Sequence, residues 1–370
     1  MLSIAWNNLT HEKGRFAVSV GGVAFAVVLV LLLWGLYAGW NNRITKYIES
    51  VRADFWVAQK GAADLSHSVS ILRSDLEDTL VALDGVASVK RFIGRQVAFD
   101  LPEEQDVHLF VVGFDPASGE NGPITMIRGS GIPGDREIII DRAFSENYGL
   151  DVGDAIPLKK GEGWSIVGIA DGGNQVIRTF AFVNLDEAQR LLDMENLTNY
   201  FLVTLQDPEQ AETVQQRIES VADVQATSRD EFITENKRIV KETFLPIVLV
   251  LLVIAFAIGA AVIGLTIYTA TIEKASEYGV LKALGFSRWA LYRVVLAQSF
   301  ISGVLGYAVG VVVAFGASWL IQIVEPSFIT DFQVSTVLWV LGMTVAMAFV
   351  AAWAPTHRIT SIDPTEVFRA

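Results

Sequence analysis

The stretch TFLPIVLVLLVIAFAIGAAVIGLTIYTATI, from Thr243 to Ile272, runs for 30 residues without Asp, Glu, Lys or Arg. About 20 apolar helical residues cross a bilayer core of roughly 30 Å, so this stretch can span a membrane with some tilt. Three further uncharged stretches occur, at Phe16–Trp40, Val294–Val324 and Phe332–Thr356. The sequence therefore predicts a membrane protein with four transmembrane α-helices.

Residues 41–242 separate the first two spans and have the composition of a water-soluble domain. Residues 41–241 carry 20 Lys and Arg against 33 Asp and Glu, a balance of −13 that equals the net charge of the whole chain. Nucleic-acid binding needs a basic footprint, so this domain is not expected to bind DNA or RNA.

The distribution of Lys and Arg orients the chain, because cytoplasmic loops are enriched in these residues. The segments 1–15, 273–293 and 357–370 hold eight Lys and Arg, whereas the short loop 325–331 holds two acids and no base. We therefore expect a plasma (inner) membrane protein with both termini cytoplasmic and the large domain extracytoplasmic. The expected order is 1–15 cytoplasmic interfacial segment, 16–40 first span, 41–242 outer domain, 243–272 second span, 273–293 cytoplasmic loop, 294–324 third span, 325–331 external loop, 332–356 fourth span and 357–370 cytoplasmic tail.

Several chemistries lack the residues they require. The chain has no cysteine, which excludes disulfides, thiolate metal sites and a cysteine nucleophile. Its four histidines, His11, His67, His108 and His357, are scattered over both sides of the predicted membrane, so no shared metal site is expected. The first span is longer than the 7–15 apolar residues of a signal peptide and is read as an uncleaved anchor. No catalytic constellation supports a membrane-anchored enzyme.

Two amphipathic segments extend the first two spans into the outer domain. Ile44, Tyr47, Ile48 and Val51 keep a helical spacing after the first span. Ser228 and Glu231 form a capping-box pattern before the second span. Residues that follow this box, including Ile239 and Val240, share one face, and Pro246 stands at the membrane entry. We call residues 41–51 and 228–246 the stalk helices, which either transmit motion or simply pack together.

The outer domain is predicted to be α+β. Two β-α-β units, with strands at 54–58, 86–92, 200–205 and 224–227 and helices at 74–83 and 208–221, suggest a split ferredoxin-like subdomain. Between them, strands at 137–141 and 165–169 and a helix at 185–194 are punctuated by glycines. The expectation is a β-rich subdomain inserted into the first.

The loop 273–293 contains a short amphipathic helix that ends at Gly285, with Ser287 placed to cap the next helix. A helix of this kind either docks in a groove of another protein or only connects two spans. Its residues Glu277-Tyr278-Gly279-Val280-Leu281-Lys282-Ala283-Leu284-Gly285 resemble the signature that follows the second span in MacB/FtsX-type (type VII) ABC transporter permeases. Further resemblances lie at Ala5–Leu9 with Lys13–Arg15, at Asn147–Asp154, Trp164–Ile169 and Val183–Leu192 of a MacB-like periplasmic core domain, and at Pro355–Glu366.

This resemblance implies a permease subunit whose docking loop contacts a separate ABC ATPase. The contact residues that it implies are Glu273, Glu277, Tyr278, Gly279, Lys282, Ala283, Leu284 and Gly285. Only 15 residues precede the first span and no Gly-x-x-x-x-Gly-Lys-Ser/Thr phosphate loop occurs, so ATP and Mg²⁺ are expected on the partner subunit and no cofactor on this chain. The implied partners are two ATPase copies, a second copy of the permease, and an adaptor or extracellular protein.

The predicted spans hold no ionisable residue, which argues against a proton relay or a charged conduit. The pairs Gly35/Gly39 and Gly306/Gly310 allow close helix approach, either within one subunit or across a dimer. Export or extraction of an amphiphile is the leading function, and an FtsX-like coupler that regulates an external partner such as a cell-wall hydrolase is the alternative. Haem is disfavoured as cargo, because Tyr37 and Glu242 are the few candidate ligands near the membrane.

Overall fold

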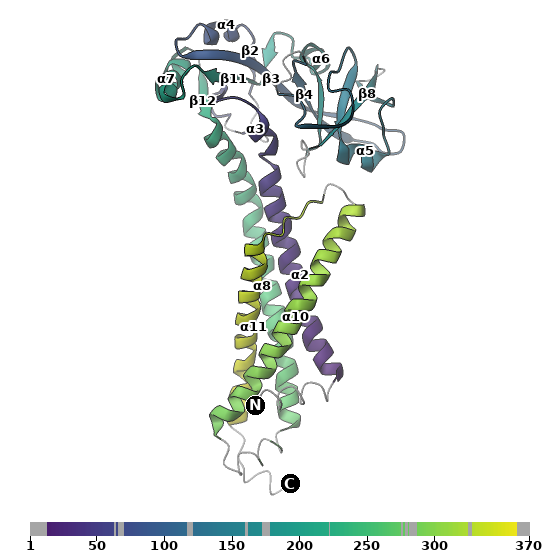
Figure 1. Ribbon diagram of the computed structural model, residues 1–370, viewed down its shortest axis with the longest axis vertical. Coiled ribbons are helices and arrows are strands. Elements are labelled where there is room, and N and C mark those ends of the chain that lie inside the picture. Colours follow the sequence, from purple (N-terminus) through teal and green to yellow (C-terminus); the bar gives the residue numbers. More distant parts are fainter. Residues whose placement is uncertain are drawn as a thin grey trace. The chain divides into compact units, whose positions relative to one another are not determined.

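The computed structural model divides the chain into two compact units (Figure 1). One unit, the helical unit, comprises Met1–Ala38, Phe244–Val324 and Thr330–Ala370, and the other, the outer unit, comprises Gly39–Thr243 and Glu325–Ile329. The structure describes residues 13–62, 64–65, 70–116, 121–159, 162–171, 178–221, 223–274, 277, 280, 287–324 and 328–360.

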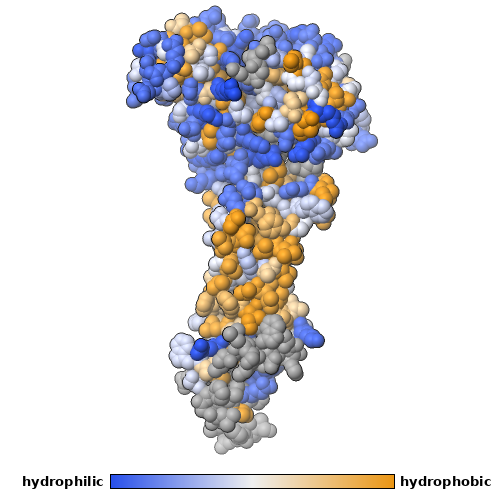
Figure 2. Space-filling view, viewed as in Figure 1, coloured by the Kyte–Doolittle hydropathy of each residue, from blue (hydrophilic) through white to orange (hydrophobic). Residues whose placement is uncertain are grey.

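Four helices among the described residues are long and apolar enough to cross a membrane. They are α2 (Lys13–Arg43), α8 (Arg229–Glu273), α10 (Arg288–Val324) and α11 (Val334–Thr360). Apolar side chains dominate their visible surface, whereas polar side chains are frequent on the outer unit (Figure 2). The predicted membrane class with four spanning helices is therefore confirmed.

Glycines on α10 let this helix pack closely on α2. A Cβ atom on Gly306 would lie 3.0 Å from the carbonyl oxygen of Val20, and one on Gly310 would lie 2.9 Å from that of Ala24. Such separations leave no room for any side chain. The sequence left open whether the pair Gly306/Gly310 packs within one subunit or across a dimer, and the structure shows it packed within the subunit.

The outer unit is built on one mixed sheet with the order β12-β1-β11-β3-β4-β9-β6-β8-β5, with β7 paired to β8. A small second sheet pairs β2 with β10. The strands are β1 (Phe55–Gln59), β2 (Leu72–Arg73), β3 (Val86–Phe99), β4 (Val107–Phe114), β5 (Thr125–Gly129), β6 (Glu137–Asp141), β7 (Ala155–Lys159), β8 (Glu162–Asp171), β9 (Phe180–Asn184), β10 (Leu197–Thr198), β11 (Tyr200–Leu205) and β12 (Val224–Ser228).

The ferredoxin-like subdomain is confirmed by strand order and direction. Its strands run β12-β1-β11-β3, and each neighbouring pair is antiparallel. Helix α4 (Leu76–Val81) connects β1 to β3, and η1 (Pro208–Gln210) with α7 (Ala211–Val221) connects β11 to β12. Leu80, Val214 and Ile218 are buried in one core with alternate side chains of these strands. Each β-α-β unit thus buries its helix on the same face of the sheet.

Strand β3 is longer than predicted and joins the two subdomains. Val86–Phe92 pairs with β11, and Ile93–Phe99 pairs with β4. The expected end at Phe92 was wrong. Gly94, Arg95 and Gln96 resemble a break, but Ile93 and Phe99 are buried and Val97 packs against the same core of the insert. The inserted subdomain therefore continues the same sheet and is not a separate body.

The insert has its own core beneath helices α5 (Arg142–Tyr148) and α6 (Leu185–Leu191). Asp141 caps α5 by accepting a hydrogen bond from the Ala143 N–H at 2.8 Å. Gly149 ends this helix with φ 63°, a left-handed conformation that glycine adopts without strain. Helix α6 ends three residues before the predicted limit at Met194.

The first stalk helix is interrupted, in contrast to the continuous helix predicted. Helix α2 ends at Arg43, and α3 (Lys46–Ser50) follows after a turn. Tyr47 of α3 is buried, and its hydroxyl donates to the Asn121 carbonyl oxygen at 2.6 Å. Burial raises the pKa of Tyr47 well above its ordinary value. The break lets α3 turn its aromatic side chain into the core against Phe180, 5.1 Å away between ring centroids.

Candidate functional site

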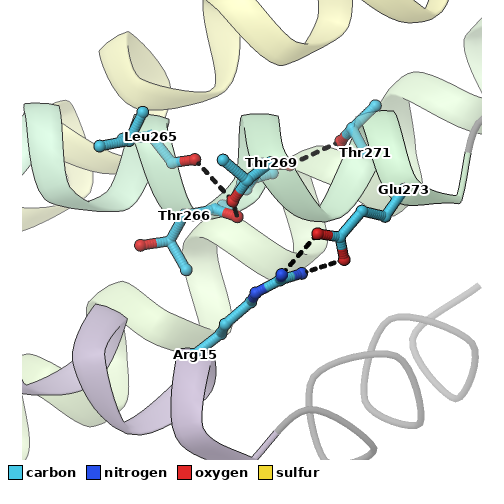
Figure 3. Close-up of polar contacts among 7 residues, drawn as sticks. Arg15, Leu265, Thr266, Thr269, Thr271 and Glu273 are labelled. Carbon is cyan, nitrogen blue, oxygen red and sulfur yellow. Dashed lines mark hydrogen bonds and ion pairs between the residues drawn. The ribbon is translucent and has the colours of Figure 1, made fainter.

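The candidate docking site begins where the ends of two helices of the helical unit meet. Arg15, near the start of α2, forms two hydrogen bonds from its guanidinium to the carboxylate of Glu273, the last residue of α8 (Figure 3). Both side chains are substantially exposed. The hydrogen bond from Arg15 lowers the pKa of Glu273, so its carboxylate is ionised at neutral pH.

The threonines at this end of α8 bond to their own helix. Thr266 donates to the Val262 carbonyl oxygen at 2.7 Å, and Thr271 donates to that of Ile267 at 2.7 Å. Thr269 donates to the Thr266 carbonyl oxygen at 2.9 Å (Figure 3). Because these hydroxyls are satisfied locally, the polar residues of α8 do not have to line an aqueous path.

Part of the predicted docking loop follows directly. Glu277 is helical and exposed, and Val280 is 44% exposed. The Ser287 hydroxyl accepts from the Ala290 N–H at 3.3 Å, which confirms the expected cap of α10. The other predicted contact residues lie outside the described residues: Tyr278, Gly279, Lys282, Ala283, Leu284 and Gly285.

The predicted stalk residues belong to one helix. Ser228 caps α8, its hydroxyl accepting from the Glu231 N–H at 3.3 Å, while the Glu231 side chain is exposed. Val240 is buried and Ile239 half-buried. Pro246 is exposed and lies inside α8, where it removes one backbone hydrogen-bond donor.

Two side chains in the first turns of α8, Phe232 and Asn236, fix this helix to the core of the outer unit. Phe232 stacks on Trp56 with ring centroids 4.6 Å apart. Asn236, which is fully buried, accepts from the Leu65 N–H at 3.1 Å and donates to the Phe232 carbonyl oxygen at 2.7 Å. The first turns of α8 are therefore anchored by aromatic stacking and by a satisfied buried amide.

Sequence reasoning missed Arg15 as the partner of Glu273. A signal was available, because the chain enters the first span just after Arg15 and leaves the second just before Glu273. Antiparallel spans place these two ends at the same membrane face, where opposite charges can pair.

The four apolar helices and the α/β outer unit together define a multi-pass membrane protein with an extracytoplasmic α/β domain.

Comparisons with known proteins specify the family. Residues 16–221 match the MacB-like periplasmic core domain, and residues 249–364 match the FtsX-like permease C-terminal model. The chain therefore belongs to the MacB/FtsX family of ABC transporter permeases.

Two curated proteins are similar to this chain over most of their own length. The lipoprotein-releasing system transmembrane protein LolC of Xylella fastidiosa is 22% identical, over 95% of this chain and 92% of its own length. The putative hemin transport system permease protein HrtB of Staphylococcus epidermidis is 21% identical, over 99% and 98%. The crystal structure of the periplasmic region of MacB from Actinobacillus actinomycetemcomitans covers 50% of this chain and 94% of its own, with 10% identity and a TM-score of 0.37.

Proposed function

We propose that this permease couples ATP hydrolysis on a separate ABC ATPase to movement of its outer domain. The observation that carries the proposal is α8, one helix of 45 residues from Arg229 to Glu273. At a rise of 1.5 Å per residue, such a helix is roughly 68 Å long. It begins with the anchored stalk residues and ends at the docking loop, so we expect a displacement at one end to reach the other along this helix, with Pro246 as the one position inside it that lacks a backbone donor.

The proposed contact with the ATPase is the loop 273–293. Glu277 and Val280 are exposed there, which suits docking in a groove of a partner. The Arg15–Glu273 ion pair holds the end of α8 against α2, so force on the loop acts on two helices together. The proposed assembly contains two permease copies and two ATPase copies, which bind ATP and Mg²⁺. Both termini of the permease are proposed to lie in the cytoplasm.

The proposed cargo is an amphiphile that is exported or extracted. Two relatives are named for lipoprotein release and hemin transport, and lipoproteins and hemin are both amphiphilic. Hemin itself is disfavoured as cargo, because the first span offers Tyr37 and no methionine as an axial ligand. An adaptor or another extracellular protein is a further proposed partner of the outer domain.

The second candidate function is a coupler that regulates an extracellular partner, such as a cell-wall hydrolase, without transport. Two observations favour it. The spans hold no ionisable residue, and the threonine hydroxyls of α8 donate to carbonyl oxygens of their own helix, so neither provides a polar path for cargo. ATPase stimulation by added lipid or lipopeptide, with loss of release in a deletion strain, supports the exporter. A stable external protein partner with no released species supports the coupler.

The docking proposal is tested by co-purification. Glu277→Lys combined with Gly285→Pro reverses one charge and removes the backbone N–H and the conformational freedom of the glycine at the predicted end of the loop helix. We expect the ATPase to be lost from the purified complex while the permease still inserts in the membrane. A matched control is Glu242→Lys, which reverses an exposed charge at the other end of the second span. Undiminished co-purification of the loop variant would show that the main contact lies elsewhere.

A further inference from the structure

A cavity of about 350 Å³ lies in the outer unit, where the two subdomains meet along β3. Asn199 and Tyr200 line it from the ferredoxin-like subdomain, and Phe110 and Arg178 from the insert. Gly94 of β3 lies between them. Ligand pockets in proteins typically measure about 300–1,000 Å³, so the space suits a small organic molecule.

The wall of the cavity is held in place by satisfied hydrogen bonds. The buried side chain of Asn199 accepts from the Gly94 N–H at 2.9 Å and donates to the Ser70 carbonyl oxygen at 2.7 Å. The Tyr200 hydroxyl donates to the Asp64 carbonyl oxygen at 2.7 Å. A Cβ on Gly94 would lie 2.8 Å from the Phe110 ring, so only glycine admits that ring here. The cavity is thus preformed.

Arginines give the wall a positive character. Arg178 donates to the Leu65 carbonyl oxygen at 2.8 Å, and its guanidinium lies 4.9 Å from the centre of the Phe110 ring. Burial lowers the pKa of Arg178, with Asp64 and Tyr200 acting in the opposite direction, and the group remains charged at neutral pH. Arg95 adds a second, exposed cation.

The remaining lining supplies one carboxylate and an apolar surface. Asp193 carries the carboxylate, which is largely exposed to solvent and lies 3.1 Å from the Lys159 ammonium. Phe110, Met194 and Leu197 form an apolar side. The cavity therefore joins cationic groups to an apolar wall.

We propose that this cavity binds a small amphiphilic anion, a carboxylate, sulfonate or phosphate joined to an apolar body. Arg178 and Arg95 face its anionic end, and Phe110, Met194 and Leu197 surround its apolar end. The site requires neither an ATPase nor transport, so it goes beyond the proposed function and stands or falls separately from it.

The test is calorimetric titration of 2-naphthoate into the full chain in lipid nanodiscs, with empty nanodiscs subtracted. We expect one binding event per chain. The neutral isostere 2-naphthamide should bind at least about tenfold more weakly, because it carries no negative charge to pair with the guanidinium groups. Equal affinity for the two probes, or no heat beyond that of empty nanodiscs, would overturn the proposal.

Two variants locate the binding event. Arg178→Gln should weaken 2-naphthoate at least about tenfold, whereas Arg217→Gln, at a residue that does not line the cavity, should leave it unchanged. Gln96→Trp places an indole in the cavity from an exposed strand position that tolerates aromatic residues, and should abolish binding while the protein still unfolds cooperatively. Undiminished binding by Gln96→Trp would place the ligand elsewhere.

Discussion

Asp141 should make the stability of the outer unit depend on pH. It ends β6, caps α5 and is only 3% exposed. Burial raises the pKa of its carboxyl from an ordinary 3.8 to about 6, against the lowering effect of the hydrogen bond from Ala143. Asp171 raises this pKa further, while Arg43 and Arg142 lower it. A shift of this size makes the free energy of unfolding about 3 kcal/mol lower when the Asp141 carboxyl is ionised than when it is protonated.

The sign follows from the direction of this shift. The folded pKa of Asp141 exceeds the unfolded one, so folding favours the protonated carboxyl. The stabilisation that this carboxyl gives the folded state is fully present below about pH 3.8 and is lost as the pH rises through about 6. Asparagine has nearly the same shape, caps helices as well as aspartate, and cannot ionise. Asp141→Asn should therefore match the wild type near pH 4 and exceed it by up to about 3 kcal/mol at pH 7.5.

The assay is urea unfolding of the fragment 39–243, which contains three apolar cores of its own, at steps between pH 4 and 8. Asp223→Asn, at an exposed carboxylate that pairs with Lys60 at 3.0 Å and does not act on Asp141, is the control and should change the free energy of unfolding little. A constant difference between Asp141→Asn and the wild type at every pH would refute the reasoning.

Three further substitutions test the packing and the docking end of the helices. Gly310→Ala should destabilise the helical unit by about 1–3 kcal/mol in detergent melts, because its methyl would meet Val27 and the Ala24 carbonyl oxygen. Gly316→Ala, with open space around it, is the control, and equal melting of the two variants would contradict the packing described. Asn236→Ala should cost the fragment 39–243 about 1–3 kcal/mol in urea by leaving the Leu65 N–H unpaired, whereas Thr234→Ala on the exposed face should cost less. Glu273→Arg should reduce ATPase stimulation by no more than about fivefold with little change in melting temperature, because exposed ion pairs contribute weakly. Adding Arg15→Glu to this variant should restore the stimulation. A double variant without restored stimulation would count against the ion pair.

The sequence predicted those features that depend on local pattern. Uncharged runs such as 243–272 identify the membrane helices by length alone. The repeated β-α-β pattern indicates the ferredoxin-like subdomain, because the two units can share a sheet in few ways. A cap such as Ser228 is visible because its partner N–H lies three residues away.

Features that depend on distant partners were not predictable in the same way. The Gly306/Gly310 pair indicates close packing but does not identify α2 as the helix it packs on. The extension of β3 beyond Phe92 depends on pairing with β4, which overrides the weak strand propensity of Gly94. The cavity joins Phe110, Arg178 and Asn199, which are far apart in the sequence and meet only in the folded sheet.

The central claim is that nucleotide state at the docking loop moves the stalk. The most direct measurement uses a spin label at Lys241→Cys, an exposed site in a chain with no native cysteine. Double electron–electron resonance then reports the distance between labels in the two permease copies of the complex with its ATPase. The account predicts that trapping ATP changes this distance, and that Glu277→Lys with Gly285→Pro abolishes the change. The same distance distribution with and without trapped ATP would contradict it.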